Sequence, residues 1–169
     1  MSSQNLPARF DQSVELAIPA LRDRPVVILD FSKIKEGERR LVEARIVNVS
    51  TYNDLEYSFN EGYREARANL AVIGYEITQA ESMWRKIQSE LILDEYPAFL
   101  KEKGLKDNAM IRDAFLERNQ GYVDARERIN MLKAMDSLVE GKIKVFENVC
   151  RYMKKQMDIT VRSINPNKY

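Results

Sequence analysis

The sequence predicts a mostly α-helical fold: a long antiparallel helical hairpin with coiled-coil-like packing, a short connector helix, and a small irregular or mixed N-terminal segment. Two observations lead to this prediction. Apolar residues recur at alternating spacings of three and four along two long stretches, a pattern typical of helices packed lengthwise on a partner. The 169 residues include only six glycines and five prolines, which argues against a turn-rich sandwich or barrel.

We expect three parts along the chain. Residues 1–50 form an N-terminal arm or small mixed segment, residues 51–160 the helical hairpin, and residues 161–169 a C-terminal tail. Within the arm, the apolar run at residues 26–29 favours a strand or an extended segment. Residues 33–49 are compatible with a helix or a strand, and their many Glu and Arg residues favour the helix.

The first long helix is predicted to begin near residue 53, with Ser50, Thr51 and Asn53 as candidate N-caps. Gly74 lies beside its apolar seam, so we expect the partner helix to approach closely there. Pro97 then breaks the helical pattern. The first seam consists of Phe59, Tyr63, Ala66, Leu70, Ile73, Ile77, Ala80, Trp84, Ile87 and Leu91.

The connection between the two long helices spans residues 94–121. Gly104 is a helix stop, and a short helix is predicted from about residue 108 to 118, capped by Asp107 or Asn108. Gly121 closes the connection. The apolar residues expected on one face of the short helix are Met110, Ile111, Ala114 and Phe115.

The second long helix has an equally unbroken seam with one polar member, Asp136. That carboxylate is expected either to form a register-setting salt bridge or to lie exposed at a gap in the seam. The second seam consists of Tyr122, Ala125, Ile129, Leu132, Asp136, Val139, Ile143, Phe146, Cys150, Met153 and Met157. A further apolar stripe runs beside it, formed by Met131, Met135, Leu138, Val145 and Val149. This wide face needs more partners, which are either the short helices of the same chain or other copies.

The composition argues against an enzyme. Histidine, the commonest general base at neutral pH and the commonest metal ligand, is absent, and Cys150 is the only cysteine. No glycine-rich phosphate-binding loop occurs. We therefore expect no catalytic residues, no cofactor and no metal, and we expect Cys150 to be a small core residue. The N-terminus does not resemble a signal peptide and no apolar run is long enough to span a membrane, so we expect an intracellular protein.

The charge distribution suggests a polyanionic partner. Residues 1–141 hold 20 Lys/Arg against 24 Asp/Glu, whereas residues 142–169 hold seven against two. Basic residues off the seams, with tyrosines nearby, suit sequence-independent binding of single strands, and an oligomer would multiply a modest patch. The alternative is a solvated face with pairs such as Glu81–Arg85 and Glu147–Arg151. The candidate nucleic-acid-binding residues are Arg64, Arg67, Arg85, Lys86, Lys142, Arg151, Lys154 and Lys155.

The helical second half of the chain resembles a known family. Residues 115–159 read FLERNQGYVDARERINMLKAMDSLVEGKIKVFENVCRYMKKQMDI. They resemble the C-terminal helix of the UvsY-like recombination mediators of tailed phages in their charged lead-in, polar helix start, mixed apolar middle and basic close at Arg151, Lys154 and Lys155. Residues 69–96 are similar to the first arm of that family's helical hairpin. Residues 1–50 have no counterpart in it.

The resemblance implies a non-catalytic, ring-forming protein that binds single-stranded DNA. Such a bacteriophage protein helps load a RecA-like recombinase onto DNA covered by single-strand-binding protein during DNA recombination, in the cytoplasm of the host cell. Family members carry basic residues near the end of the first hairpin helix, similar to Arg85 and Lys86 here. The sequence leaves a second function open, a helical interaction or assembly module such as a phage adaptor, a virion component or an inhibitor of a host protein.

Overall fold

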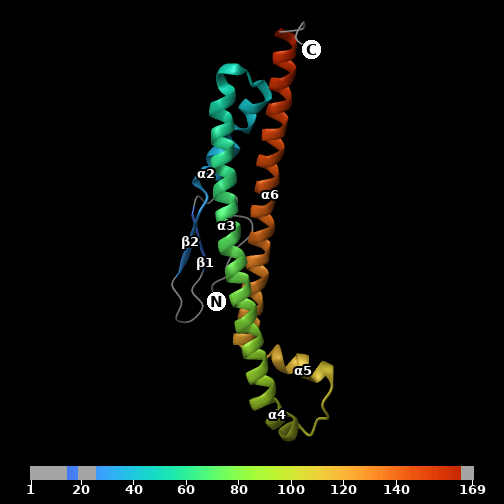
Figure 1. Cartoon of the computed structure of the whole chain (residues 1–169). Coiled ribbons are helices and arrows are strands. Elements are labelled where there is room, and N and C mark those ends of the chain that lie inside the picture. Colours follow the sequence, from blue (N-terminus) through green and yellow to red (C-terminus); the bar gives the residue numbers. More distant parts are fainter. Residues whose placement is uncertain (1–14, 19–25, 165–169) are drawn as a thin grey trace. The chain divides into compact units, whose positions relative to one another are not determined.

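The computed structural model describes residues 15–18 and 26–164. The fold is mostly α-helical, and the two long helices form the antiparallel hairpin that the sequence predicts (Figure 1). The elements in chain order are β1 (Glu15–Ile18), β2 (Val27–Asp30), α2 (Ser32–Arg39), the 3-10 helix η1 (Arg40–Ile46), α3 (Val49–Glu90), the π-helical turn η2 (Leu91–Glu95), α4 (Tyr96–Lys103), α5 (Ala109–Leu116) and α6 (Gln120–Ile164). Of the predicted C-terminal tail, residues 161–169, the first four continue α6 as helix and residues 165–169 lie outside the described residues, as do residues 1–14 and 19–25 of the predicted N-terminal arm.

The chain divides into two compact units, and each contains one segment of α3 packed against one segment of α6. The terminal unit comprises Met1–Ala71 and Ser137–Tyr169, and the central unit comprises Val72–Asp136. In the terminal unit the rings of Phe59 and Phe146 pack with centroids 6.2 Å apart. In the central unit the rings of Trp84 and Tyr122 pack with centroids 5.6 Å apart.

The two apolar seams are confirmed, because every seam residue is buried or half-buried. Asp136 is half-buried and forms no ion pair with any residue in the described ranges, so the expected salt bridge is wrong and the expected exposure is only partial. Cys150 is also half-buried, and burial raises the pKa of its thiol. The thiol is therefore uncharged at neutral pH and behaves as a small apolar group.

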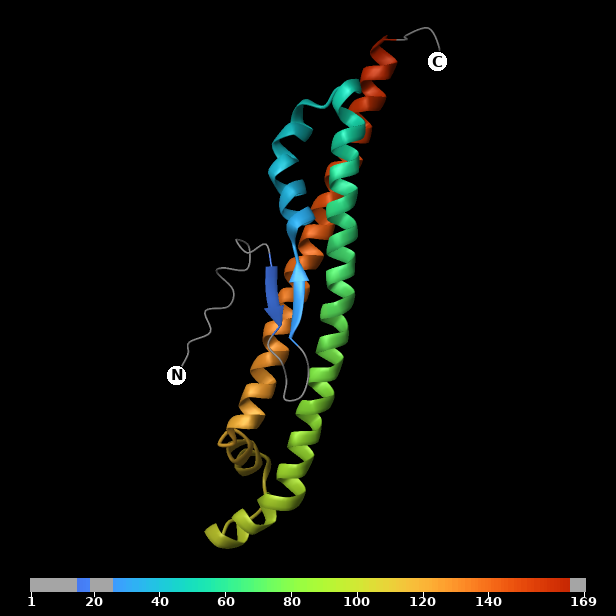
Figure 2. The same cartoon turned by 90° about the vertical axis from the view of Figure 1, so that its left-hand side faces the viewer.

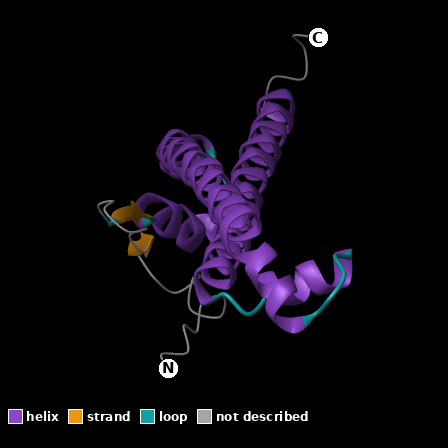
Figure 3. Ribbon diagram, turned by 90° about the horizontal axis from the view of Figure 1, so that it is seen from below, coloured by secondary structure: helices purple, strands orange, loops and turns teal. Residues whose placement is uncertain are grey.

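The N-terminal elements confirm both predictions made for them. Residues 33–46 are helical, and residues 27–30 form β2, which pairs antiparallel with β1 so that Ile18 lies opposite Val27. The sequence did not predict β1. The strand pair lies beside the helices of the terminal unit (Figure 3), and the side-chain amide of Asn69 on α3 donates to the carbonyl of Asp30 at 2.5 Å.

The second apolar stripe of α6 is partly covered within the terminal unit by the N-terminal helices. Figure 2 shows α2 and η1 lying along the hairpin. Leu41 and Ala44 of η1 share a groove with Val145 and Val149 of α6. Val145 stays partly exposed, so the cover is incomplete.

The close helix approaches occur at Gly37 and Gly62, and the prediction of one at Gly74 is wrong. A Cβ atom at Gly37 would lie 2.7 Å from the Phe146 ring, and one at Gly62 would lie 2.8 Å from it. A Cβ at Gly74 would meet nothing within 4 Å. Gly74 borders the seam in sequence, but its position on the helix turns it away from the partner.

Two helix boundaries differ from the predictions. Asn48 caps α3, because its side-chain oxygen accepts from the backbone N–H groups of Ser50 at 3.0 Å and Thr51 at 3.1 Å, so the three predicted caps are wrong. Pro97 does not end the helical path. Proline has no backbone N–H to donate to a carbonyl of the preceding helical turn, and the helix widens into a π-helical turn just before it. Pro97 then lies in the first turn of α4, where no N–H is needed.

The connector helix is confirmed as α5, and Asn108 is its cap, accepting from the Ile111 N–H at 2.9 Å. Gly104 ends α4 in the left-handed conformation at φ 62°, as its role as a helix stop requires. The predicted apolar face is only partly right. Met110 is 81% exposed, whereas Leu116, which the prediction left out, is buried against the central unit's core.

Candidate nucleic-acid interface

The second half of α6, in the terminal unit, carries five exposed cations. In Figures 1 and 2 the final turns of α6 continue past the start of α3, so fewer neighbours cover those turns. Spacings of seven, four and seven residues place four of the basic residues along one face of the helix. We call this surface the basic stripe. Its members, all exposed, are Lys144, Arg151, Lys154, Lys155 and Arg162.

The centre of the basic stripe is little neutralised by its surroundings. Lys154 and Lys155 form no ion pair with any residue the structure describes, and Arg151 reaches only the side-chain oxygen of Asn148, at 3.5 Å. Lys144 pairs with Glu140 at 3.0 Å in an exposed i, i+4 contact. Such exposed pairs are weak and exchange readily with other anions. Tyr152, exposed beside Arg151, adds an aromatic face to this part of α6.

Lys142 lies outside the stripe, although the sequence predicted it as a binding residue. Its ammonium group pairs with Glu38 of α2 at 2.6 Å, and its side chain is 21% exposed. The contact joins α2 to α6 within the terminal unit. Lys142 therefore contributes to packing of the N-terminal helix, and its charge is turned away from an external anion.

The predicted residues on α3 within the terminal unit have local partners. Arg64 pairs with Glu61 at 2.8 Å. Arg67 donates to the Tyr63 hydroxyl at 3.1 Å, which raises the pKa of Arg67, and it lies 3.6 Å from Glu147 of α6. Both guanidinium groups are exposed, so a phosphate has access to them once these surface contacts give way.

Arg85 and Lys86 belong to the central unit, so the predicted set is divided between two units. Lys86 lies 3.8 Å from Glu90. Both predicted i, i+4 pairs are wrong, because Glu81 pairs with Lys133 at 2.8 Å and Glu147 with Arg67. In each of these pairs the glutamate lies on one long helix and its basic partner lies on the other.

The sequence prediction left Lys144 and Arg162 out of the candidate site. Both residues contribute to the positive net charge of residues 142–169. Helical spacing is the signal that identifies them as site residues, since each lies seven residues from a stripe residue. The basic stripe unites three predicted residues, Arg151, Lys154 and Lys155, with these two.

Within residues 15–18 and 26–164, no three His, Cys, Asp or Glu side chains gather closely enough to hold a metal ion. None of the helices in that part of the chain combines the length and the apolar character that crossing a membrane requires. Comparisons of the chain with protein-family models, with curated proteins and with solved structures find no match.

Proposed function

We propose that this protein is a non-catalytic mediator of DNA recombination that binds single-stranded DNA, assembles into homo-oligomers, and helps load a RecA-like recombinase onto DNA covered by single-strand-binding protein. The observation behind the proposal is the basic stripe on α6, whose central cations are exposed and lack acidic partners among the described residues. The resemblance to UvsY-like mediators supports the recombinase and single-strand-binding protein as partners.

Phosphate binding by the stripe follows from its charge and exposure. Lysine and arginine side chains that neutralise phosphates release condensed counterions, so affinity falls as salt rises. Tyr152 offers a ring for base stacking next to Arg151, and stacking tolerates any base sequence. A single stripe provides few charges, so we expect tight binding only when several copies present their stripes together.

The proposal is tested by binding of a fluorescent 40-mer of single-stranded DNA across a salt series. The variant that removes Arg151, Lys154 and Lys155 by substitution with Gln should bind at least tenfold more weakly at low salt. Its log affinity should also depend less steeply on log salt, by about 2, because each lost phosphate contact lowers the slope by roughly 0.7 on single strands.

The matched control removes three exposed lysines of the central unit, Lys101, Lys103 and Lys106, by the same substitution. It changes the net charge equally and should leave binding close to that of the unmodified protein. Equal weakening in both variants would mean that only net charge matters. Absence of binding at low salt would contradict the proposed function.

Self-association is expected through an exposed apolar corner in the terminal unit. The corner consists of Val42, Ile46 and Val49, at the junction of η1 with α3, and Ile46 is 82% exposed. Exposed apolar surface of this kind marks interaction sites. The same corner also favours the second function, a helical assembly module that docks on another protein.

Light scattering of Ile46→Ser with Val49→Ser tests this surface. We expect a smaller assembly than that of the unmodified protein, whereas Leu93→Ser, an exposed apolar residue of the central unit, should leave the assembly unchanged. An assembly that depends on the corner, in a protein that ignores DNA at low salt, would favour the assembly module over the mediator.

A further inference from the structure

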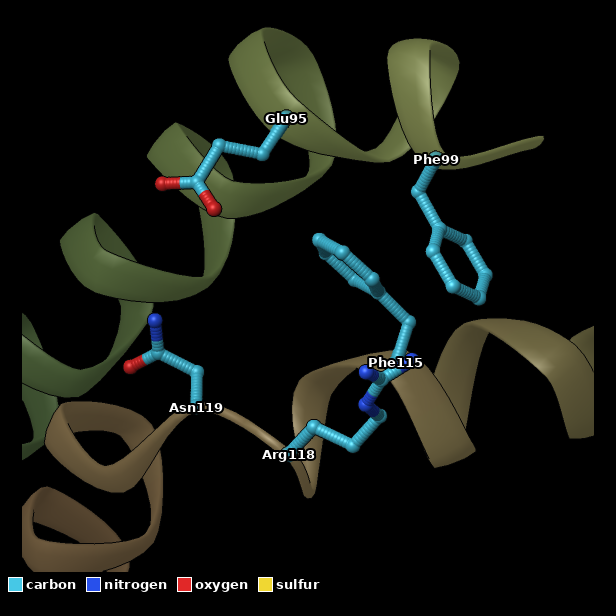
Figure 4. Close-up of a pocket in the computed structure, with 5 residues that line it drawn as sticks. All are labelled: Glu95, Phe99, Phe115, Arg118 and Asn119. Atoms are coloured by element: carbon cyan, nitrogen blue, oxygen red, sulfur yellow. The ribbon is translucent and has the colours of Figure 1, made fainter. Parts of the chain in front are cut away.

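A second site of a different kind lies in the central unit, where α4, α5 and the π-helical turn meet. A pocket of about 230 Å³ is lined by Glu95, Phe99, Phe115, Arg118 and Asn119. Figure 4 shows the Phe115 ring, the Glu95 carboxylate and the Asn119 amide bordering one open space. None of these residues belongs to the basic stripe.

The aromatic wall of the pocket is a packed group of three rings. The Phe115 centroid lies 5.1 Å from that of Phe99 and 5.2 Å from that of Tyr96. The Arg118 guanidinium lies 5.5 Å from the Phe99 centroid, so a cation covers part of this wall. Phe115 remains half-exposed, so part of its surface is open to a planar ligand.

The polar side of the pocket consists of Glu95 and Asn119, and the backbone around each residue sets the position of its side chain. Glu95 is the last residue of the π-helical turn, a rare geometry that is frequent at functional sites. Its carboxylate forms no hydrogen bond or ion pair with the described residues. Asn119 uses its side-chain oxygen to accept from the Tyr122 N–H at 3.1 Å as the cap of α6, which leaves its amide hydrogens for a ligand.

We propose that this pocket binds one unstacked guanine base of a DNA single strand, an inference that rests on the proposed function. Phe115 supplies the stacking surface, and Arg118 a cation for the flanking phosphate. Guanine is the base that presents two adjacent hydrogen-bond donors, N1–H and the 2-amino group, on its Watson–Crick edge. A carboxylate accepts both, so Glu95 matches guanine, and the Asn119 amide donates to its O6 or N7.

The test compares strands that differ in one donor. Alternating thymine–guanine and thymine–hypoxanthine 40-mers have the same phosphates, but hypoxanthine lacks the 2-amino group. We expect the protein to bind the guanine strand about tenfold more tightly, and Glu95→Gln to remove the difference. Asp94→Asn is the matched control, because Asp94 lies on the same π-helical turn but does not line the pocket. It should keep the guanine preference.

Phe115→Leu tests stacking, because leucine has no aromatic ring. Leucine keeps an apolar side chain against the cluster of Leu91, Leu116 and Tyr122, on which Phe115 packs, so the core stays filled. It should weaken binding of both strands about tenfold. Trp84, the only tryptophan, packs on the same cluster, so its fluorescence reports whether the variant is folded.

Equal affinity for the two strands, with steep salt dependence intact, would overturn this inference and leave the proposed function standing. No binding of either strand at low salt would overturn both. Titration with dGMP distinguishes the source of the base. Binding of dGMP as tight as that of the strand would assign the pocket to a free nucleotide and overturn the strand-based proposal, whereas weak dGMP binding that Glu95→Gln abolishes would support it.

Discussion

The terminal and central units stabilise the pairing of α3 with α6 by different means. In the terminal unit the Phe146 ring fills the space left by Gly37 and Gly62, and α3 meets α6 through apolar contacts and the exposed Arg67–Glu147 ion pair. In the central unit Glu76 of α3 pairs with Arg128 of α6 at 3.1 Å, with side chains 7% and 9% exposed. Shape therefore defines the register in one unit, and a buried charge pair helps to define it in the other.

The largest expected effect comes from breaking the buried pair of the central unit. Glu76→Gln removes the negative charge of the buried Glu76–Arg128 pair, which should lower the free energy of unfolding by about 3–5 kcal/mol. Urea unfolding followed by the fluorescence of Trp84 measures this, because the only tryptophan lies in the affected unit. Far-UV circular dichroism in parallel reports the helices of both units.

Two controls sharpen the result. Glu81→Gln breaks the solvent-exposed pair with Lys133 on the same two helices and should have a much smaller effect. Replacing both Glu76 and Arg128 by Met should recover much of the stability, because both charges of the buried pair are removed together and apolar side chains take their place. A loss in Glu76→Gln no greater than that in Glu81→Gln would contradict the contrast between the units.

The next effect tests the role of shape in the terminal unit, with two glycines of the same helix. Gly62→Ala places a methyl group 2.8 Å from the Phe146 ring and 3.1 Å from the Lys33 carbonyl, and overpacking of this kind costs about 1–3 kcal/mol. Gly74→Ala meets no neighbour and should stabilise α3 by about 1 kcal/mol, because alanine is the better helix former. Chemical unfolding measures both variants, and changes of the same sign would contradict the close packing at Gly62.

The parts of the fold that the sequence predicted depend on local patterns. The seams follow a periodic pattern, whereas the helix cap at Asn108 and the helix end at Gly104 each depend on the chemistry of one residue. The structure confirms the seams, the cap and the helix end. The failures depend on distant partners. Whether Gly74 or Gly62 needs to be small depends on where Phe146 packs, and no pattern within α3 contains that information.

The candidate site shows the same contrast between features set by local patterns and features set by distant partners. Arg151 and its neighbours are exposed because they lie off the seam near the end of α6, a property that spacing predicts. Lys142 also lies off the seam, but Glu38 of a helix far away in sequence captures its charge. The pocket at Glu95 depends on a π-helical turn, and single-sequence periodicity does not predict where a helix widens by one residue.

The smallest expected effect concerns a charge that the terminal unit half-buries. The carboxylate of Glu65 on α3 accepts from the backbone N–H of Ile34 at 2.8 Å, in the first turn of α2. Burial raises the pKa of Glu65 above its ordinary value of 4.5, although the hydrogen bond from Ile34 acts in the opposite direction. The folded state therefore favours the protonated acid. The resulting stabilisation is fully present below pH 4.5 and is lost as the pH rises through the folded-state pKa.

Glu65→Gln replaces this acid by a neutral side chain whose oxygen still accepts from Ile34. Its free energy of unfolding, relative to that of the unmodified protein, should therefore increase as the pH is raised from 4 to 7, and far-UV circular dichroism in urea measures it at each pH. Glu61→Gln, one turn earlier on α3, controls for the loss of one negative charge from the same helix. A relative stability of Glu65→Gln that falls over this range would mean that the hydrogen bond from Ile34 outweighs burial. Glu65 would then be an anionic cap of α2, and the terminal unit, like the central one, would depend on a partly buried charge.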